Sequence, residues 1–470
     1  MCKQEREAGN MDVRQAENRL IKNSQTENVL IEIPKQVEFI ISRLQQHGYE
    51  AYAVGGCVRD ALLGRKPNDW DITTSARPEQ VKDVFKRTID TGIQHGTVTV
   101  MEDHIGFEVT TYRIDGEYED GRHPKEVQFT PDLREDLRRR DFTINAMAYS
   151  PELGIVDLFG GQEDLENGIV RCVGSAEDRF NEDALRIMRA VRFAAQLGFV
   201  IEEETYCAIK KLAPNLKKIS AERIQAELSK LLLSPHPECF RSLYETGITA
   251  VILPEFDAAV NCAQNSPYHC YSVGEHTYHV IEHTPVDLPL RLAAVLHDLG
   301  KAEAKTTDEN GRDHFYGHPE KSEKIAGKIL RRLKYDNHTI DRTCRLVLYH
   351  DYKIKAEEKS VRRAVNRIGA DLFDDLLILQ RADAAAKPEK VCRQAVEQIG
   401  KIETVYRGIT ERKECTSLKM LAVTGKDLIE AGMKPGRELG QVLNRLLEHV
   451  LDHPEDNDRE ILLKLWKNLQ

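Results

Sequence analysis

The spacing of apolar residues changes character once along this chain, and that change constrains the fold more than any other feature. Short segments with strand-type patterns lie before about residue 155, at 52–54, 69–73, 97–101 and 107–112. Helical patterns at 34–48 and 57–63 are interspersed among them. Beyond about residue 157 the patterns are long and amphipathic, as at 182–197 and 222–232. The sequence therefore predicts a mixed fold: an α/β head with a small mixed sheet, followed by a mostly α-helical remainder.

Breaks in these patterns divide the chain into parts. A length of 470 residues is too great for one hydrophobic core, so several domains are expected. The breaks fall near residue 155, between 255 and 270, where Asn, Gln, Ser and Pro gather, and near residue 390. We expect a polar leader, an α/β head, a helical neck, a second helical domain and a helical tail, at 1–33, 34–155, 156–260, 261–390 and 391–470.

The amino-acid composition indicates the cellular compartment of the protein. There is no run of about 18 apolar residues, so no membrane span is expected. The first 28 residues are polar and lack the apolar core of a signal peptide. Ten cysteines are scattered without a CxxC pair, a distribution typical of reduced thiols. The sequence therefore predicts a cytoplasmic protein.

Two carboxylates, Asp69 and Asp71, stand in the segment Pro-Asn-Asp-Trp-Asp-Ile. In a strand, residues i and i+2 point to the same face, so both would present oxygen ligands side by side. Taken alone, an Asp-x-Asp pair is more often a solvated turn. Alternation along 107–112 places Glu108 on one face of a second strand, where a charge is unusual unless it serves a site. We therefore expect Asp69, Asp71 and Glu108 to be catalytic.

Phosphate-binding features accompany these acids. Gly55 and Gly56 allow the backbone to approach a phosphate closely, and Arg59 follows with a charge-assisted donor. The net charge of −10 argues against a surface that is basic throughout. Arg138, Arg139 and Arg140 nevertheless form a local basic patch, which is enough for a protein that holds one end of an RNA.

Three neighbouring carboxylates repel one another unless divalent cations neutralise them. Two Mg²⁺ ions at such a site support phosphoryl transfer, because they activate the attacking 3′ hydroxyl and stabilise the leaving pyrophosphate.

These residues resemble a known family. The motifs Gly55-Gly56-x-Val58-Arg59-Asp60, Leu63-Gly64, Asp69-x-Asp71 and 139–146 (RRDFTINA) occur in the order found in class II tRNA nucleotidyltransferases and bacterial poly(A) polymerases. The resemblance covers about residues 35 to 235. It implies template-independent addition of nucleotides to the 3′ end of tRNA, with CTP and ATP as substrates.

The resemblance also implies roles for individual residues. The segment Glu182-Asp183-x-x-Arg186 matches the family's nucleotide-selecting motif, so Asp183 and Arg186 would hydrogen-bond the base edge in place of a template. Arg140, Arg189 and Arg192 would hold phosphates or shape the pocket. The loop 115–124 resembles the flexible loop of enzymes that add all of CCA. The motif 220–228 would brace the pocket helix through its Glu and Arg.

A second metal site is predicted in the 261–390 domain. The order His276, His297-Asp298 and His350-Asp351 resembles an HD domain. His276, His297, Asp298 and Asp351 are the expected ligands, with His318 and His350 as alternatives, and the metal would be a transition ion such as Ni, Mn, Fe or Co. HD domains resemble phosphohydrolases, whereas in some relatives the domain is a scaffold.

Alternatives to CCA addition stay open at this point. One is a poly(A) polymerase or an enzyme that adds only CC or only A. Another is an HD phosphohydrolase with an RNA-binding head, and a third is an RNA-binding protein without chemistry. The sequence does not predict the oligomeric state.

Overall fold

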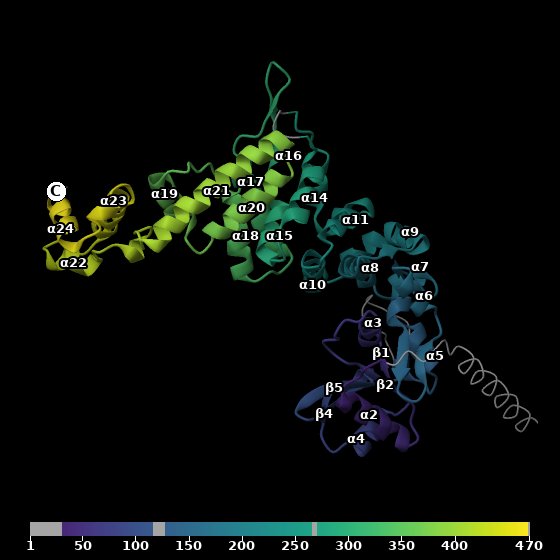
Figure 1. The fold of residues 1–470 in the computed structure, drawn as a ribbon. Helices are drawn as coiled ribbons and strands as arrows, with labels where there is room; N and C mark the ends of the chain where they lie inside the picture. The colour runs from purple at the N-terminus through teal and green to yellow at the C-terminus, as the bar shows by residue number, and fades with distance from the viewer. Residues whose placement is uncertain (1–30, 116–126, 266–269, 469–470) are drawn as a thin grey trace, which may run out of the picture. The chain divides into compact units, whose positions relative to one another are not determined.

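The computed structural model describes residues 31–115, 127–265 and 270–468, and within them the chain forms two compact units (Figure 1). The first unit comprises the described residues up to Leu231 together with Ser242–Ile252. The second comprises Leu232–Arg241 and the described residues from Leu253 onward. Most of the expected leader and nearly all of the loop 115–124 lie outside the described residues.

A mixed sheet of seven strands forms the centre of the head, in the order β3-β4-β5-β2-β1-β8-β9. Only the β2–β5 pairing is parallel, with Ile72 opposite Val109, and the other pairings are antiparallel. The strands are β1 (Ala51–Val54), β2 (Ile72–Thr74), β3 (Thr88–Gly92), β4 (Thr97–Glu102), β5 (Ile105–Thr111), β8 (Met147–Ser150) and β9 (Gly154–Asp157). The expected α/β head with a small mixed sheet is confirmed.

Helices of the first unit follow the predicted apolar spacing. α2 (Lys35–Gln46) buries Val37, Ile40, Ile41 and Leu44, which recur at helical spacing and lie on one face. The further helices of this unit are α3 (Gly56–Leu62), α4 (Pro78–Val84), α5 (Leu133–Arg138), α6 (Gly161–Glu166), α7 (Ala176–Glu182), α8 (Leu185–Leu197), α9 (Glu203–Leu212), α10 (Ala221–Leu232, whose last residue is in the second unit) and α12 (Thr249–Ile252). Helix α11 (Phe240–Glu245) contains residues of both units.

Short paired strands complete the first unit and occur once in the second. β6 (Arg113–Asp115) pairs with β7 (Val127–Phe129), and β10 (Ile169–Val170) pairs with β11 (Val200–Ile201). In the second unit, β12 (Thr306–Thr307) and β13 (Asp313–His314) form a hairpin.

Two boundary predictions were wrong. The strand expected at 69–73 begins only at Ile72, so Asp69 and Asp71 lie in the segment that leads into β2. The helix expected at 182–197 is divided into α7 and α8, because Asp183 is extended (φ −138°, ψ 104°). Its carboxylate accepts a hydrogen bond from the backbone N–H of Leu185 (3.0 Å) and so caps the following helix. Asp183 and Arg186 therefore do not share one continuous helical face.

The second unit is almost entirely helical. Its helices are α13 (Pro254–Val260), α14 (Val273–His283), α15 (Leu288–Leu296), α16 (Lys301–Ala304), α17 (His318–Arg332), α18 (Asn337–Tyr349), α19 (Glu358–Ile368), α20 (Phe373–Ala385), α21 (Glu389–Glu411), α22 (Gly425–Glu430), α23 (Arg437–Asp452) and α24 (Arg459–Asn468). α14, α15, α17, α18 and α20 pack against one another. The last three helices enclose a small core of their own that includes Leu428, Leu446, Val450 and Trp466.

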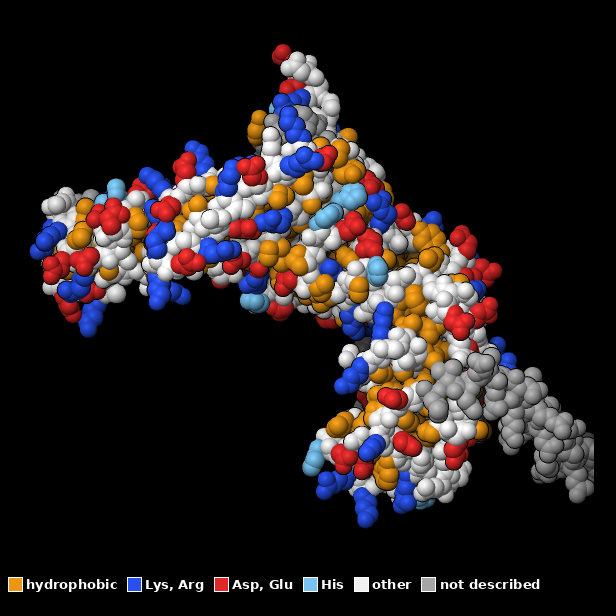
Figure 2. All heavy atoms as spheres, in the orientation of Figure 1, with side chains coloured by type: hydrophobic (Ala, Val, Ile, Leu, Met, Phe, Trp, Pro, Cys, Tyr) orange, Lys and Arg blue, Asp and Glu red, His pale blue; other side chains and the backbone are white. Residues whose placement is uncertain are grey.

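The described surface carries charges of both signs. On the face shown in Figure 2, Lys and Arg side chains are interspersed with Asp and Glu over much of the second unit. In the described ranges, no helix has both the length and the apolarity needed to cross a membrane.

Candidate functional site

Two of the predicted carboxylates, Asp71 and Glu108, are neighbours where β2 and β5 begin to pair, and Asp69 precedes them in the segment that leads into β2. Because Ile72 pairs with Val109 in parallel register, the preceding residues Asp71 and Glu108 are neighbours at the start of that ladder. Glu108 is exposed between the buried side chains of Phe107 and Val109, so it faces the opposite side of the sheet from them. Asp69 and Asp71 are also exposed, two residues apart in the incoming segment.

The electrostatics of this group favour a cation. Burial by surrounding protein atoms raises the pKa of Asp71, Arg140 opposes the rise and Asp69 adds to it. Deprotonated Asp71 is therefore disfavoured in the protein alone. Carboxylate oxygens are the ligands that Mg²⁺ prefers, and the donor set of Asp69, Asp71 and Glu108 fits such an ion.

Arg140 is held beside these acids by a buried carboxylate. Asp136 is fully buried and accepts bonds from Arg139 (2.8 Å), from Arg140 (3.3 Å) and from the Thr73 hydroxyl (3.1 Å). Although burial opposes the effect, the two arginines lower the pKa of Asp136, which keeps its charge. Since Thr73 belongs to β2, this network connects the arginines to the strand that follows Asp71.

Gly55 allows Arg140 to take this position. Its φ of +84° is in the left-handed region, and a Cβ at this position would lie 3.0 Å from Arg140 Nη1. A side chain here would displace the arginine. Gly56 begins α3, which carries Arg59.

Arginines from distant motifs gather around the ring of Phe193. The guanidinium carbons of Arg59, Arg189 and Arg192 lie 5.0, 5.3 and 3.9 Å from its centroid. Arg59 donates to the Asn145 side-chain oxygen (2.6 Å) and Arg189 pairs with Asp141 (2.6 Å), so the 139–146 motif contacts both. Although burial opposes the effect, Arg189 and Arg186 lower the pKa of Asp141.

Asp183 and Arg186 each have a separate protein partner. Asp183 accepts from Arg223 Nη2 (2.6 Å), while Arg186 donates to Glu182 (2.5 Å) and to the Arg139 carbonyl (3.0 Å). Arg192 pairs with Glu227 (2.6 Å). Arg223 and Glu227 both belong to α10, and their contacts match the bracing role expected for the 220–228 motif.

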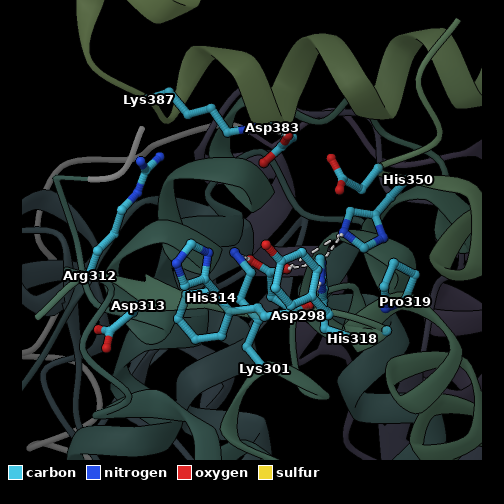
Figure 3. A pocket seen from close by; sticks show the side chains of 14 residues that line it. Asp298, Lys301, Arg312, Asp313, His314, His318, Pro319, His350, Asp383 and Lys387 are labelled. Carbon is cyan, nitrogen blue, oxygen red and sulfur yellow. Dashed lines mark hydrogen bonds and ion pairs between the residues drawn. The ribbon is translucent and has the colours of Figure 1, made fainter. Parts of the chain in front are cut away.

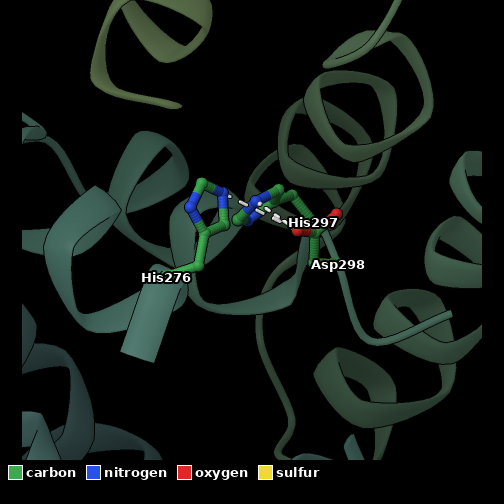
Figure 4. A group of neighbouring side chains, drawn as sticks. All are labelled: His276, His297 and Asp298. Carbon is green, nitrogen blue, oxygen red and sulfur yellow. Dashed lines mark ion pairs between the residues drawn. The ribbon is translucent and has the colours of Figure 1, made fainter. Parts of the chain in front are cut away.

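A second cluster of polar side chains is buried in the second unit. His276 comes from α14, His297 and Asp298 follow α15, His318 begins α17 and His350 follows α18. Their side chains form two possible metal-binding groups that share Asp298, His276/His297/Asp298 (Figure 4) and Asp298/His318/His350. All five are at most 8% exposed.

The expected ligand Asp351 is in neither of these groups, but it lines the same cavity as Asp298, His318 and His350. It is exposed and pairs with Lys353 (2.5 Å), while its neighbour His350 points toward Asp298 (Figure 3). His350, which was predicted only as an alternative ligand, therefore belongs to the cluster. Asp383 was not predicted, and its Oδ1 lies 2.8 Å from His276 Nε2. It stands between two alanines near the end of α20, without a metal-site motif around it.

A cavity of about 420 Å³ opens onto this cluster. Its lining includes Asp298, His318, His350 and Asp383, together with the cations Lys301, Arg312 and Lys387 (Figure 3). Although burial opposes the effect, His297 and Lys301 hold the pKa of Asp298 well below its usual range. Burial lowers the pKa of His318 to about 4, so this imidazole is neutral near pH 7. Neutral imidazole and charged carboxylate are the forms that bind metals.

Known proteins resemble nearly the whole chain. Family models match the poly(A) polymerase head domain at 51–171, an RNA- and SrmB-binding site of polymerase A at 198–260, and domain 2 of tRNA nucleotidyltransferases at 318–466. The CCA-adding enzyme of Levilactobacillus brevis is 35% identical over 420 residues, which cover 87% of this chain and 91% of that enzyme.

Other relatives match a shorter stretch of this chain at higher identity. The CCA-adding enzyme of Lactiplantibacillus plantarum is 52% identical over 212 residues, which are 44% of this chain. The chain spans about half the length of this and several similar relatives, 52% in this case.

Solved structures also resemble this chain. The CCA-adding enzyme of Bacillus stearothermophilus in complex with CTP is 31% identical, with a TM-score of 0.68 and coverage of 93% of this chain and 98% of that one. The Thermotoga maritima enzyme complexed with tRNA is 20% identical with a TM-score of 0.60, covers 94% of this chain and 97% of that one, and supports the fold alone.

Proposed function

This chain belongs to the family of CCA-adding enzymes, the tRNA nucleotidyltransferases with a poly(A) polymerase head domain, and on that premise we propose that it adds CCA to the 3′ end of tRNA from CTP and ATP. The observation that carries the proposal is the register of β2 and β5, which brings Asp71 beside Glu108 with Asp69 next to them. A surface loop or a binding relic has no need of three carboxylates in this arrangement.

The head residues have separate proposed roles in metal binding and in triphosphate binding. Asp69, Asp71 and Glu108 would hold two Mg²⁺ ions, which would lower the pKa of the attacking 3′ hydroxyl and stabilise the negative charge of the leaving pyrophosphate. Gly55, Gly56 and Arg59 lie at the start of α3 with Arg140 against them, and this side of the site receives the triphosphate. Arg189 and Arg192 are positioned by Asp141 and Glu227.

Asp183 and Arg186 select the base. A carboxylate accepts about four hydrogen bonds, so Asp183 can keep its bonds from Arg223 and Leu185 and still accept from a base amino group. Arg186 has five N–H donors, and its bonds to Glu182 and the Arg139 carbonyl leave donors for a base edge. These protein contacts fix both side chains before the nucleotide arrives.

Extension of a tRNA that lacks CCA, with one labelled nucleotide at a time, tests the activity. Two CMP residues followed by one AMP are expected. An ATP-dependent product of indefinite length would indicate a poly(A) polymerase, and a product that stops at CC, or that forms only from a CC end, would indicate a partial enzyme. Each of these results would refute full CCA addition.

Base selection gives a prediction for Arg186. Replacing Arg186 by Ala should lower the preference for CTP over UTP by about 10- to 100-fold, because a bidentate pair contributes about 1–3 kcal/mol of discrimination. The measurement is kcat/KM for each nucleotide. Arg179→Ala is a matched control, since Arg179 contacts the same Glu182 (2.5 Å) and has no assigned contact with the base. Equal discrimination in Arg186→Ala and the unchanged protein would contradict the assignment.

We place this reaction in the cytoplasm. The nine cysteines in the described part of the chain are all free thiols, which suits a reducing compartment.

A metal-dependent phosphohydrolase is a second proposed activity, located at the buried cluster around Asp298. It is supported by convergent His and Asp side chains at the floor of a cavity whose walls carry Lys301, Arg312 and Lys387, a combination suited to a metal ion and a phosphate ester. A transition metal such as Ni, Mn, Fe or Co fits donors that are mostly imidazole nitrogens.

The two activities should separate by mutation. His297→Ala or Asp298→Ala is expected to abolish metal-stimulated hydrolysis of cyclic nucleotides to nucleoside monophosphates and to leave CCA addition within about threefold, since the cluster lies wholly in the second unit. Formation of the nucleoside monophosphate and incorporation of CMP are measured on the same preparations. Equal loss of both activities would identify the cluster as a structural metal site instead.

A further inference from the structure

The basic patch at 138–140 is divided between two places in the structure. Arg139 and Arg140 bond to the buried carboxylate of Asp136 beside the catalytic acids. Arg138 is the last residue of α5, and its side chain is 65% exposed. Its ion pair with Glu135 is long, at 3.7 Å, and an exposed pair of this kind restrains a side chain only weakly. The charge of Arg138 is therefore accessible to a ligand.

Arg138 lines a cavity of about 250 Å³ in the first unit, together with two arginines that were not predicted to bind a ligand. Arg134 lies four residues earlier on α5, so both side chains are on one face of that helix. Arg179 comes from α7 and is held by Glu182 (2.5 Å) and by the Arg138 carbonyl (3.2 Å). Two helices thus bring three cations to one cavity.

The lining of this cavity is chemically suited to one unit of an RNA chain. Against its three arginines stands the carboxylate of Asp178, so the lining is positive in a chain whose net charge is −10. Glu182 is shared between Arg179 and Arg186, both at 2.5 Å, and does not neutralise Arg179 alone. Arginine matches phosphate oxygens with a planar set of N–H donors. Phe159 adds an apolar wall that suits a ribose or the face of a base.

We propose that this cavity binds a backbone phosphate of the acceptor strand of tRNA, with Arg134, Arg138 and Arg179 as donors. The proposed base-selecting residue Arg186 donates to the Arg179 carbonyl (3.3 Å), so the cavity adjoins the residues that would read the incoming nucleotide. The triphosphate of that nucleotide is already assigned to the start of α3, and a phosphate in this cavity therefore belongs to the RNA. The inference rests on the proposed function, because it takes tRNA as the RNA.

Equilibrium binding of a labelled tRNA that lacks CCA to the full chain, without nucleotide, tests the proposal. Arg138→Ala should weaken binding about 5- to 10-fold and reduce the slope of log affinity against log salt by about 1, because one phosphate contact is lost. Arg138→Lys keeps the charge and should retain most of the affinity. Arg87→Ala is the matched control, since Arg87 is an exposed arginine of the same unit outside this lining, and it should change the affinity by less than about twofold.

The acid in the lining gives a prediction of opposite sign. Asp178→Asn removes the negative charge from the cavity and should tighten tRNA binding about two- to threefold, an effect that a loss of structure would not produce. The KM for CTP should stay within about twofold in every variant, because the triphosphate is assigned to the start of α3. A raised KM for CTP with unchanged tRNA affinity in Arg138→Ala would give the cavity to the free nucleotide and overturn the proposal.

Ethylation of single phosphates in the tRNA locates the contact. Ethylation in the acceptor strand should block binding to the unchanged protein, and Arg138→Ala should lose this interference at one of those phosphates. Interference that is the same in both proteins, or that is lost only outside the acceptor strand, would overturn the proposal. Binding through Arg138 by a protein that adds no nucleotide would support the phosphate site and refute the proposed activity, whereas CCA addition with unchanged tRNA affinity in Arg138→Ala would refute the site alone.

Discussion

Replacing Asp71 by Asn should reduce the rate of nucleotide addition by about 10³-fold or more without destabilising the head. The amide has the shape of the carboxylate but lacks the charge that holds a divalent cation, and metal-ion stabilisation is worth several kcal/mol, about 1.4 kcal/mol for each tenfold in rate. Burial and Asp69 raise the pKa of Asp71, which means that its charged form opposes folding at neutral pH. A neutral side chain should therefore leave the metal-free head at least as stable.

Opposite effects on rate and stability distinguish a metal ligand from a structural residue. Single-turnover incorporation of CMP measures the rate, and thermal unfolding of the metal-free protein measures the stability. Asp90→Asn is a suitable control, because Asp90 is an exposed acid on β3 of the same sheet and should alter neither quantity. An Asp71→Asn variant that keeps its addition rate would refute the mechanism, as would one whose lost rate follows from lost structure.

Apolar periodicity predicted most elements of the head. The helix expected at 34–48 is α2, the segment 97–101 is β4, and the segment 107–112 corresponds to β5, because in each case burial of alternate or helically spaced residues decides the local structure. The proximity of Asp71 to Glu108 could not be predicted from apolar periodicity. It depends on a parallel register between β2 and β5, and a single sequence contains no direct signal of register.

A polar side chain caused one of the two errors in the element boundaries. Asp183 interrupts an otherwise continuous helical pattern because its carboxylate bonds to the backbone N–H of Leu185. That local bond outweighs the apolar periodicity on either side of it. The segment 69–71 has no strand pairing with β5, and the ladder with β5 begins only at Ile72.

Tertiary packing decided which residues meet in the second unit. The HD signature located His276, His297 and Asp298, whose places in the cluster depend on the packing of two helices, α14 and α15. Whether His350 or the adjacent Asp351 points inward depends on how the chain leaves α18, and His350 does so with its Nδ1 bonded to the Val347 carbonyl. Asp383 has no motif around it, so only its contact with His276 reveals it. The catalytic roles of all these residues stay predictions.

Replacing Glu227 by Leu should cost about 3–5 kcal/mol in the free energy of unfolding of the first unit, because it leaves the Arg192 guanidinium buried without a counter-charge. Glu227 and Arg192 are only 4% and 7% exposed, and their side chains lie 2.6 Å apart. Burial lowers the pKa of Arg192 to about 10, and Glu227 opposes this decrease more strongly than Asp141 does, so Glu227 is the main counter-charge of the cation. An exposed pair provides the control: Asp90→Ala, which removes the partner of Lys82, should cost less than about 1 kcal/mol.

Adding Arg192→Met to Glu227→Leu should restore most of the lost stability, because two apolar side chains replace a buried ion pair at little or no cost. Urea unfolding followed by the fluorescence of Trp70, in a Trp466→Phe background, isolates the first unit, since the chain contains two tryptophans and Trp466 lies in the second.

The same double variant decides what Arg192 does. Its guanidinium donates to Gln196 and contacts Glu227 and the Phe193 ring, so we expect it to shape the pocket rather than hold a phosphate. The KM for CTP should then stay within about threefold of its original value once stability is restored. A stable double variant whose KM rises by about 10-fold or more would instead place Arg192 on the triphosphate, since a lost charge-assisted bond is worth about 1.5–3 kcal/mol.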